Sequence, residues 1–242
     1  AGCGQVEELL IETPLVLSAR GGVRVQVTVE GPDEAGRRVV GVYAQSEDTA
    51  LEGEWIRHAA GVVAPVDVVV AEGGGLSVWP PAGAVAVDLG GFYPALAEVG
   101  LVYGPVFRGV RAAWRRGEEL FAEVALPDDV SAGGFGLHPA LLDAALHVIV
   151  GTGERRELPE VPFAWGRVSL HAVGASVARV RVTPSGAGEG VSLILADEVG
   201  GLIASVGSLV LRPLSAGVAS ARDGLFGVEW VPASLGGQPV GS

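Results

Sequence analysis

The sequence predicts an α+β fold made mainly of antiparallel β-sheet, with few helices. Short segments in which apolar and polar residues alternate, or in which β-branched residues follow one another, recur along the chain, and turn residues separate them. This pattern is typical of a meandering antiparallel sheet more than of a parallel one. Apolar residues make up 49% of the 242 positions, which is enough for a buried core.

The first half of the chain is expected to be mostly strands. Four are predicted, at residues 15–18, 22–29, 38–45 and 55–63. The segment GVRVQVTV at 22–29 alternates most cleanly, so one of its faces should be buried. Residues 65–90 break into glycine and proline, including the run GGG at 73–75 and the pair Pro80-Pro81, and we interpret them as an inter-lobe linker.

The second half is also expected to be mostly strands, with two helices. A short helix at 92–99 should end at Gly100, the usual C-terminal position of glycine. A hairpin of residues 107–114 and 119–126 and a second helix follow, and then strands at 163–172, 176–183, 190–196 and 202–213. A helix wrapped by a long antiparallel sheet is the outline of a hot-dog fold. The element order alone, without a visible sequence repeat, indicates two such lobes, at residues 1–64 and 91–215.

Composition excludes several classes of function. The net charge is −12 and arginine supplies every basic residue, which argues against nucleic acid as a partner. Short arginine clusters at 37–38, 115–116 and 155–156 are interpreted as solvated turn residues, with a small basic patch for an acidic partner as the alternative. No apolar run reaches the roughly 18 residues of a membrane span, and the first residues lack a signal-peptide pattern. We therefore expect a cytoplasmic protein that does not contact a membrane.

The single cysteine, Cys3, excludes an internal disulfide and a cysteine-based zinc site, so no metal or redox cofactor is predicted. The chain also contains no methionine, and we expect that it is cut from something longer. After a linker of small residues, the segment DGLFGVEWVPAS at 223–234 returns to an apolar, strand-like pattern. Residues 216–242 are therefore interpreted as a linker and the start of a next region.

One carboxylate stands out in the segment HPALLDAALH at 138–147, because apolar residues surround it. On a helix, Asp143 and His147 lie four residues apart and share a face, with Pro139 in the first turn. Apolar surroundings favour the protonated form of a carboxyl group, which suits a general acid. From spacing alone, a tolerated acid at a helix end is an equal alternative, since such environments also occur in structural networks.

Three sequence motifs that occur in a fixed order indicate the function more specifically than this spacing does. YGPVFRGV at 103–110, HPALLDAALH at 138–147 and VPFAWGRVSLHAVGAS at 161–176 together resemble the dehydratase domain of modular type I polyketide synthases. RVVGVYAQ and EWIRHAAGVVAP, before residue 65, also resemble that family's N-terminal lobe. The closing LFGVEWVPAS is similar to its lead into a ketoreductase region.

The resemblance implies a double hot-dog fold and the removal of water from a β-hydroxyacyl thioester to give an α,β-unsaturated thioester. The substrate would be carried on the phosphopantetheine arm of acyl carrier protein, and the domain itself would hold no cofactor. Asp143 matches the family's proton-donating aspartate, and His147 matches the final position of the D-x-x-x-Q/H motif. The residues implied to orient the acid or to line the pocket are His147, Tyr103, Pro105, Phe107, His138 and Leu142, with Val106 a further candidate from motif position.

The family's catalytic base is a histidine in an H-x-x-x-G-x-x-x-x-P motif that this sequence lacks. The first hot-dog is therefore expected to be incomplete at its N-terminus and to expose apolar surface. None of the four histidines is a convincing substitute. His58 and His171 are interpreted as structural strand residues, His138 as a cap or pocket residue, and His147 as a group that orients Asp143.

Two hypotheses follow from the resemblance. In the first, the chain is the acid-bearing part of a dehydratase and is inactive by itself, with acyl carrier protein, neighbouring synthase domains and a second copy as partners. In the second, it is a catalytically inactive remnant that serves as a structural or dimerisation element of the synthase. A free-standing hot-dog thioesterase fits poorly, because the linker-like ends and the three ordered motifs indicate a multidomain parent.

Overall fold

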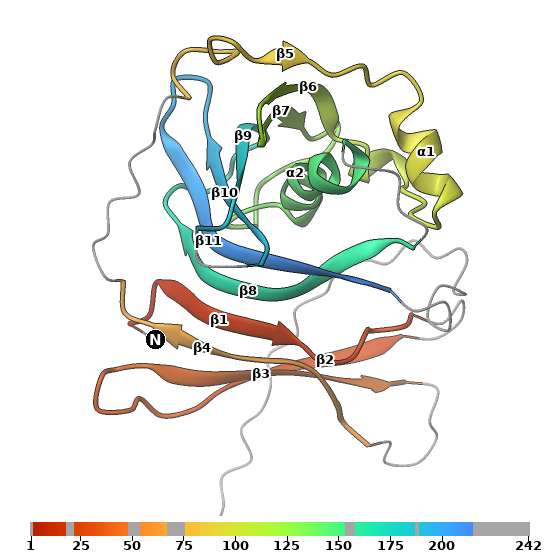
Figure 1. Cartoon of the computed structure of the whole chain (residues 1–242). Helices are drawn as coiled ribbons and strands as arrows, with labels where there is room; N and C mark the ends of the chain where they lie inside the picture. The colour runs from red at the N-terminus through yellow and green to blue at the C-terminus, as the bar shows by residue number, and fades with distance from the viewer. Residues whose placement is uncertain are drawn as a thin grey trace, which may run out of the picture.

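The computed structural model describes residues 2–17, 22–47, 54–66, 76–152, 158–186 and 189–214. Within these residues, a single antiparallel sheet of eleven strands runs in the order β2-β3-β4-β1-β8-β11-β10-β9-β7-β6-β5 (Figure 1). The strands of the first half are β1 (Gln5–Ile11), β2 (Val23–Val29), β3 (Arg38–Ser46), β4 (Ile56–Ala64) and β5 (Val85–Ala86). The strands of the second half are β6 (Val110–Arg116), β7 (Glu119–Ala125), β8 (Glu160–Leu170), β9 (Val177–Pro184), β10 (Val191–Ala196) and β11 (Leu202–Pro213).

The sheet curves around one helix in the second half of the molecule. Helix α2 (Pro139–Gly151) lies inside the curve and packs against β6, β7 and β9, while the shorter α1 (Phe92–Glu98) packs beside it (Figure 1). The main apolar core lies between α2 and the inner face of these strands, where Leu141, Ala144 and Val148 have no exposed surface. This lobe has the predicted hot-dog arrangement of a sheet wrapped around a helix.

The first lobe has the strands of a hot-dog but, in the described part of the chain, no helix packed on them. Strands β2, β3, β4 and β1 continue the sheet below the second lobe (Figure 1). Val25 and Val27 on β2 are more than half exposed, and Ile56 on β4 is 53% exposed. The expected exposure of apolar surface in this lobe is therefore confirmed for these strands.

Strand β1 joins the two lobes. It pairs with β4 on one side and with β8 on the other, where Leu9 lies opposite Trp165. A register shift between Val6 and Glu8 in the pairing with β4 marks a bulge in this strand. The pairing makes one continuous ladder through both lobes, so backbone hydrogen bonds hold the lobes together.

Most of the predicted elements are present, and four predictions need correction. The alternating strand β2 was expected to bury one face, but none of its residues is buried, because in the described chain no helix covers this part of the sheet. Residues 15–17 form no strand, residue 18 lies outside the described residues, and the strand that precedes β2 is β1, at Gln5–Ile11. Residues 107–109 are not part of the hairpin, because Phe107 ends a short 3-10 helix, η1 (Pro105–Phe107). Within residues 65–90, Val85–Ala86 form a short strand that pairs with β6. The predicted region at 216–242 and the run GGG at 73–75 lie outside the described residues.

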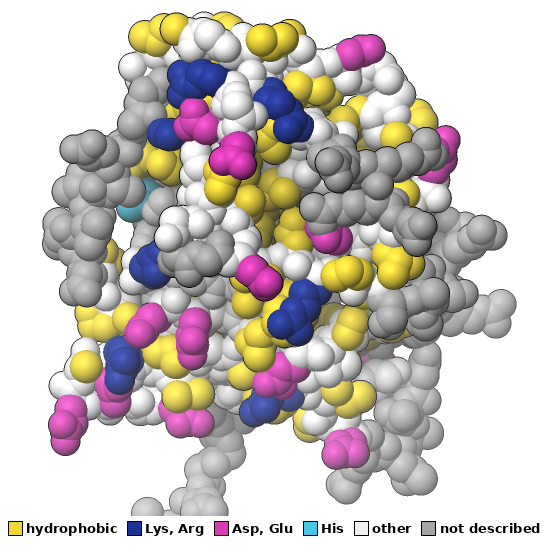
Figure 2. All heavy atoms as spheres, in the orientation of Figure 1, with side chains coloured by type: hydrophobic (Ala, Val, Ile, Leu, Met, Phe, Trp, Pro, Cys, Tyr) yellow, Lys and Arg dark blue, Asp and Glu magenta, His cyan; other side chains and the backbone are white. Residues whose placement is uncertain are grey.

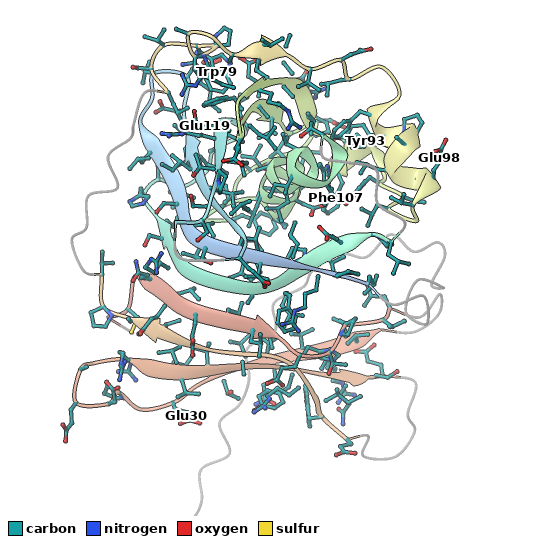
Figure 3. All side chains as sticks on the ribbon, viewed as in Figure 1. Glu30, Trp79, Tyr93, Glu98, Phe107 and Glu119 are labelled. Carbon is teal, nitrogen blue, oxygen red and sulfur yellow. The ribbon has the colours of Figure 1, made fainter. Side chains whose placement is uncertain are left out.

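The described part of the predicted linker packs on the outer face of the sheet. Trp79, labelled in Figure 3, lies near the short strand β5. Its ring meets those of Trp114 and Phe121 edge to face, with centroids 5.4 and 6.1 Å apart, and the guanidinium of Arg179 lies over it. Leu76 joins the same small apolar cluster. Leu76 and Trp79 therefore cover apolar surface on the side of the sheet that faces away from α2.

Charges of both signs are mixed on the surface. On the face shown in Figure 2, arginine side chains lie among acidic ones and form no single basic patch. Arg37 pairs with Asp33 at 3.0 Å, and Arg116 pairs with Glu119 at 2.7 Å, so these members of the arginine clusters have acidic partners within the chain. The cluster at 155–156 lies outside the described residues. In the described chain, no helix has the length and apolar character needed to cross a bilayer.

Candidate active site

Helix α2 begins as the sequence predicts. Pro139 occupies the first turn, where its missing N–H costs no hydrogen bond. His138 is the N-cap, and its Nδ1 accepts a hydrogen bond from the backbone N–H of Ala140 at 3.2 Å. The expected capping position of His138 is therefore observed. Apolar residues then bury most of the helix surface, so that from Ala144 to Val148 every residue is buried.

Asp143 and His147 form a hydrogen-bonded pair on α2. His147 Nε2 lies 3.0 Å from Asp143 Oδ2, and the two residues are four apart, so they share a helix face as predicted. The side chain of His147 is 1% exposed, whereas that of Asp143 is 34% exposed. The expectation that the apolar neighbours bury the carboxyl group is thus wrong in part. Those neighbours bury the imidazole, and the carboxyl group points towards accessible space.

Two tyrosines surround the imidazole of His147. The ring of Tyr103 lies against it with centroids 3.9 Å apart and planes tilted by 43°. The ring of Tyr93, on α1, meets it edge to face at 5.8 Å, and the Tyr93 hydroxyl lies 3.5 Å from His147 Nδ1. Tyr103 was predicted to lie near this site. Tyr93 was not, because it stands outside the three sequence motifs.

Both tyrosines keep their hydroxyl protons more firmly than a solvated tyrosine. Burial raises the pKa of Tyr103 strongly, and the negative charge of Asp143 and then Tyr93 raise it further. Burial also raises the pKa of Tyr93, against the backbone hydrogen bond from Val110, which lowers it. Around neutral pH both side chains are therefore neutral hydroxyl groups that can donate hydrogen bonds.

The motif YGPVFRGV places Tyr103 against α2. Gly104 is extended and leads into η1, and Arg108 Nε donates a hydrogen bond to the Tyr103 carbonyl at 2.8 Å, which closes the turn. Gly109 then passes so close to α2 that a Cβ atom on it would lie only 2.8 Å from the Cβ of Ala144. The glycine thus permits the close approach that brings Tyr103 to His147.

The remaining predicted pocket residues lie around the same helix. Pro105 and Phe107 belong to η1, which packs beside α2 (Figure 3 labels Phe107). Both residues are exposed, Phe107 to 36%. Val106 and Leu142 are half-buried, and Val106 packs against the main core. Their contribution to a substrate pocket stays a prediction.

The other histidines have partners away from Asp143. His58, on β4 in the first lobe, has Nδ1 2.9 Å from the Thr13 carbonyl oxygen. His171, just after β8, has Nε2 3.0 Å from the Ser205 hydroxyl. Neither of these rings contacts Asp143 in the described part of the chain.

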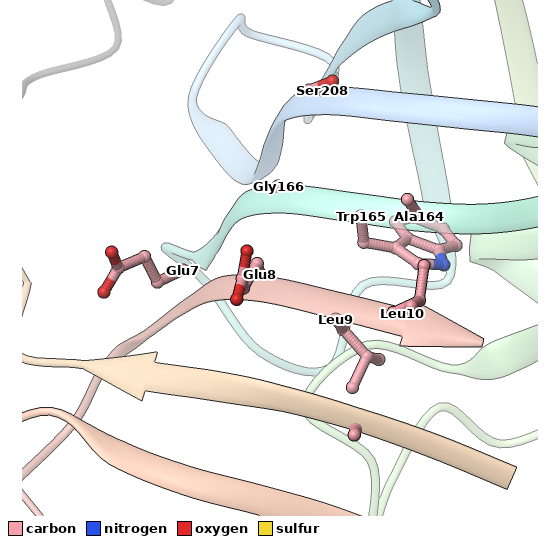
Figure 4. Close-up of a pocket in the computed structure, with 9 residues that line it drawn as sticks. Glu7, Glu8, Leu9, Leu10, Ala164, Trp165, Gly166 and Ser208 are labelled. Carbon is pink, nitrogen blue, oxygen red and sulfur yellow. The ribbon is translucent and has the colours of Figure 1, made fainter. Parts of the chain in front are cut away.

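An open cavity of about 380 Å³ lies beside the junction of the lobes rather than at Asp143. Its lining comes from β1, β4, β8 and β11, with Glu8 and Trp165 among the residues in Figure 4. The described residues contain no group of three or more histidine, cysteine or acidic side chains that could hold a metal ion. Cys3 is half-buried, and its thiol lies 3.6 Å from the Gly36 carbonyl oxygen.

Comparison of the chain with known proteins finds one family. Residues 71–221 match the family model described as "Polyketide synthase dehydratase N-terminal domain". A dehydratase structure described for substrate selection in the borrelidin and fluvirucin polyketide synthases is 44% identical, with a TM-score of 0.80, covering 88% of this chain and 75% of that one. The dehydratase domain from the terminal module of the rifamycin polyketide synthase is 48% identical, with a TM-score of 0.77, and the coverage is 88% and 76%.

The fold and the comparisons define a domain of the double hot-dog class found in polyketide synthase dehydratases. The chain belongs to the polyketide synthase dehydratase family. Among curated relatives, polyketide synthase GfsA of Streptomyces halstedii is 52% identical over 240 residues, which is 95% of this chain and 3% of that protein. The mycoketide-CoA synthase of Mycobacterium tuberculosis is 49% identical, over 96% of this chain and 6% of that protein. The chain therefore spans only a small part of these multidomain synthases.

Proposed function

We propose that this chain contributes the acid half of a dehydratase active site, in which Asp143 protonates the leaving hydroxyl of a β-hydroxyacyl thioester. The observation that carries the proposal is the hydrogen-bonded pair of Asp143 and His147, in which a buried imidazole contacts a carboxyl group that is accessible from outside. The substrate is carried on the phosphopantetheine arm of acyl carrier protein, and the product is an α,β-unsaturated thioester.

The elimination needs an acid and a base. A base removes the α-proton, the electron pair of that C–H bond forms the new double bond, and the β-carbon releases its hydroxyl group. Hydroxide is a poor leaving group near neutral pH, so the proton of Asp143 moves to the departing oxygen and water leaves. The hydrogen bond from His147 Nε2–H to Asp143 persists and becomes charge-assisted once the carboxylate has formed, which stabilises the new charge.

The base is supplied by polypeptide outside these 242 residues. His58 and His171 have partners remote from Asp143, His138 caps α2, and the 1% exposure of His147 shields its ring from a substrate. The related dehydratase structures support this division, since the chain covers only 75% and 76% of the two described above. Acyl carrier protein, adjacent synthase domains and a second copy of the domain are the proposed partners, in the cytoplasm.

The test is a substitution in the full synthase polypeptide. Asp143→Asn removes the transferable proton, so we expect the initial rate at which a β-hydroxyacyl thioester is converted to the unsaturated thioester to fall by roughly 10² to 10⁴, the usual contribution of general acid catalysis. Mass spectrometry of the acyl thioester measures the conversion. Asp129→Asn, on an exposed turn, is the matched control and should leave conversion unchanged.

Two results would count against the proposal. Turnover by Asp143→Asn close to that of the wild type would remove Asp143 from the acid role. A wild-type synthase that yields no unsaturated product from any β-hydroxyacyl thioester offered to this domain would favour the alternative, an inactive remnant that serves as a structural or dimerisation element.

A further inference from the structure

Tyr93 connects the backbone of β6 to the candidate acid. The backbone N–H of Val110 donates a hydrogen bond to the Tyr93 hydroxyl oxygen at 3.0 Å. Val110 is the first residue of β6, and Tyr93 lies on α1, so this bond ties the helix to the start of the strand. The hydroxyl oxygen is thereby held in place and already accepts one hydrogen bond.

The hydroxyl hydrogen of Tyr93 is still available for donation, and His147 Nδ1 lies 3.5 Å away as the acceptor. A neutral imidazole has one nitrogen that donates and one that accepts. When Nδ1 accepts from Tyr93, the ring hydrogen is on Nε2, the nitrogen that lies 3.0 Å from Asp143 Oδ2.

We propose that Tyr93 is a positioning residue that fixes the Nε2–H tautomer of His147 and thereby directs the acidic proton of Asp143 to Oδ1. Oδ2 accepts the hydrogen bond from His147, so the transferable proton is carried by the other carboxyl oxygen, which is free to meet the substrate hydroxyl. The catalytic part of this inference rests on the proposed function, whereas the tautomer of His147 does not.

Tyr103 provides an internal comparison. Its ring lies over the face of the imidazole at 3.9 Å, whereas Tyr93 meets the ring at an interplanar angle of 88° and brings its hydroxyl to Nδ1. Tyr103 therefore contributes packing, and Tyr93 contributes the hydrogen bond that selects the tautomer. Removing only the hydroxyl group from each tyrosine separates these two contributions.

Nitrogen NMR of the chain labelled with ¹⁵N-histidine tests the tautomer directly. The chain has four histidines, and the signals of His147 are those that disappear in His147→Gln. In the wild type we expect an acceptor-type shift for Nδ1 and a donor-type shift for Nε2. Tyr93→Phe should move the two shifts towards each other, because both tautomers become populated, and Tyr103→Phe should leave them apart.

The wild-type spectrum alone can overturn the proposal, so the test does not depend on a variant that folds. A donor-type Nδ1 in the wild type, or an unchanged pair of shifts in Tyr93→Phe, would exclude the positioning role. In the full synthase, Tyr93→Phe should lower kcat roughly threefold to tenfold, as the loss of one hydrogen bond allows, with KM nearly unchanged. If Asp143→Asn keeps its turnover while the tautomer result holds, the proposed function fails and the assignment of Tyr93 stands.

Discussion

The side chain of His147 is buried to 1% exposure, while that of Asp143, one helical turn earlier and 3.0 Å away, is 34% exposed. Helix α2 therefore presents the carboxyl group outwards and keeps the imidazole beneath it. A group in this position can orient and stabilise the acid but is poorly placed to meet a substrate. The asymmetry assigns different roles to two residues that the sequence places on the same helix face.

This difference in roles can be measured in the full synthase. His147→Ala removes the hydrogen bond to Asp143 Oδ2 and leaves the acid in place, so we expect a loss of about tenfold in turnover, well below the loss in Asp143→Asn. His147→Gln should stay close to the wild type, because an amide can donate to Asp143 and accept from Tyr93 at the same time. Equal losses in His147→Ala and Asp143→Asn would mean that the two roles are assigned wrongly.

The sequence predicts this site because its determinants are local. The spacing of Asp143 and His147 and the position of Pro139 depend only on helix geometry, which the structure follows. The exposure of Asp143 is not local, since it depends on which elements cover each face of α2. Tyr93 was missed for the same reason, because its contact with His147 spans 54 positions in sequence.

The strands differ in the same way, because some can be predicted from their own residues and others depend on the strands beside them. Strand β2 was predicted because VRVQVTV alternates, whereas β1, with the sequence QVEELLI, has adjacent glutamates followed by adjacent apolar residues and no clear period. β1 lies between β4 and β8, and pairing on both sides together with a bulge at Val6 and Glu8 holds it as a strand. Tertiary pairing of this kind leaves little trace in the strand's own residues.

Gly109 should tolerate no side chain. A Cβ atom there would lie 2.8 Å from the Cβ of Ala144 and 2.9 Å from the Ala125 carbonyl oxygen, so α2 and β7 would have to move apart. We expect Gly109→Ala to lower the free energy of unfolding by about 1–3 kcal/mol, as overpacking of a core does. Chemical denaturation of the chain measures the change.

Gly104, in the same motif, is the matched control for Gly109. It has a φ of −70°, and a Cβ there would meet nothing within 4 Å, so Gly104→Ala should be neutral or should stabilise by about 0.5 kcal/mol. A similar loss of stability in both variants would show that the close approach of Gly109 to α2 is not the reason why a side chain at residue 109 destabilises the fold.

Glu119 should make the fold sensitive to acid. Its carboxylate accepts hydrogen bonds from Arg116 and from Arg181, each at 2.7 Å (Figure 3 labels Glu119). Burial raises the pKa of Glu119, but the hydrogen bonds and charges of the two arginines outweigh it and lower the pKa overall. Between the pKa of an unfolded glutamate, about 4.3, and the lower folded value, the unfolded chain binds more protons, so stability falls as the pH falls.

The acid sensitivity can be assigned with one substitution. Glu119→Gln should lower the free energy of unfolding by about 1 kcal/mol near neutral pH and should flatten its decline below about pH 5, because the titrating group is gone. Urea titrations at neutral and acidic pH measure both effects. Glu118→Gln, at the neighbouring exposed position, should keep the wild-type decline. If Glu119→Gln keeps the full decline, other carboxyl groups are responsible for it.

Tyr103 should make the fold sensitive to alkali, for the opposite reason. Burial and the charge of Asp143 raise its pKa above the value of about 10 for an unfolded tyrosine, so in that window the folded chain holds a proton that the unfolded chain has released. The free energy of unfolding then falls as the pH rises above about 10, by up to about 1.4 kcal/mol per pH unit for one such group. Tyr103→Phe should show a shallower decline in urea titrations. In a pH titration followed by tyrosinate absorbance, Tyr103→Phe should reduce the absorbance change of the phase at higher pH. If it reduces the phase at lower pH instead, the Tyr103 hydroxyl is not held in its neutral form beside Asp143.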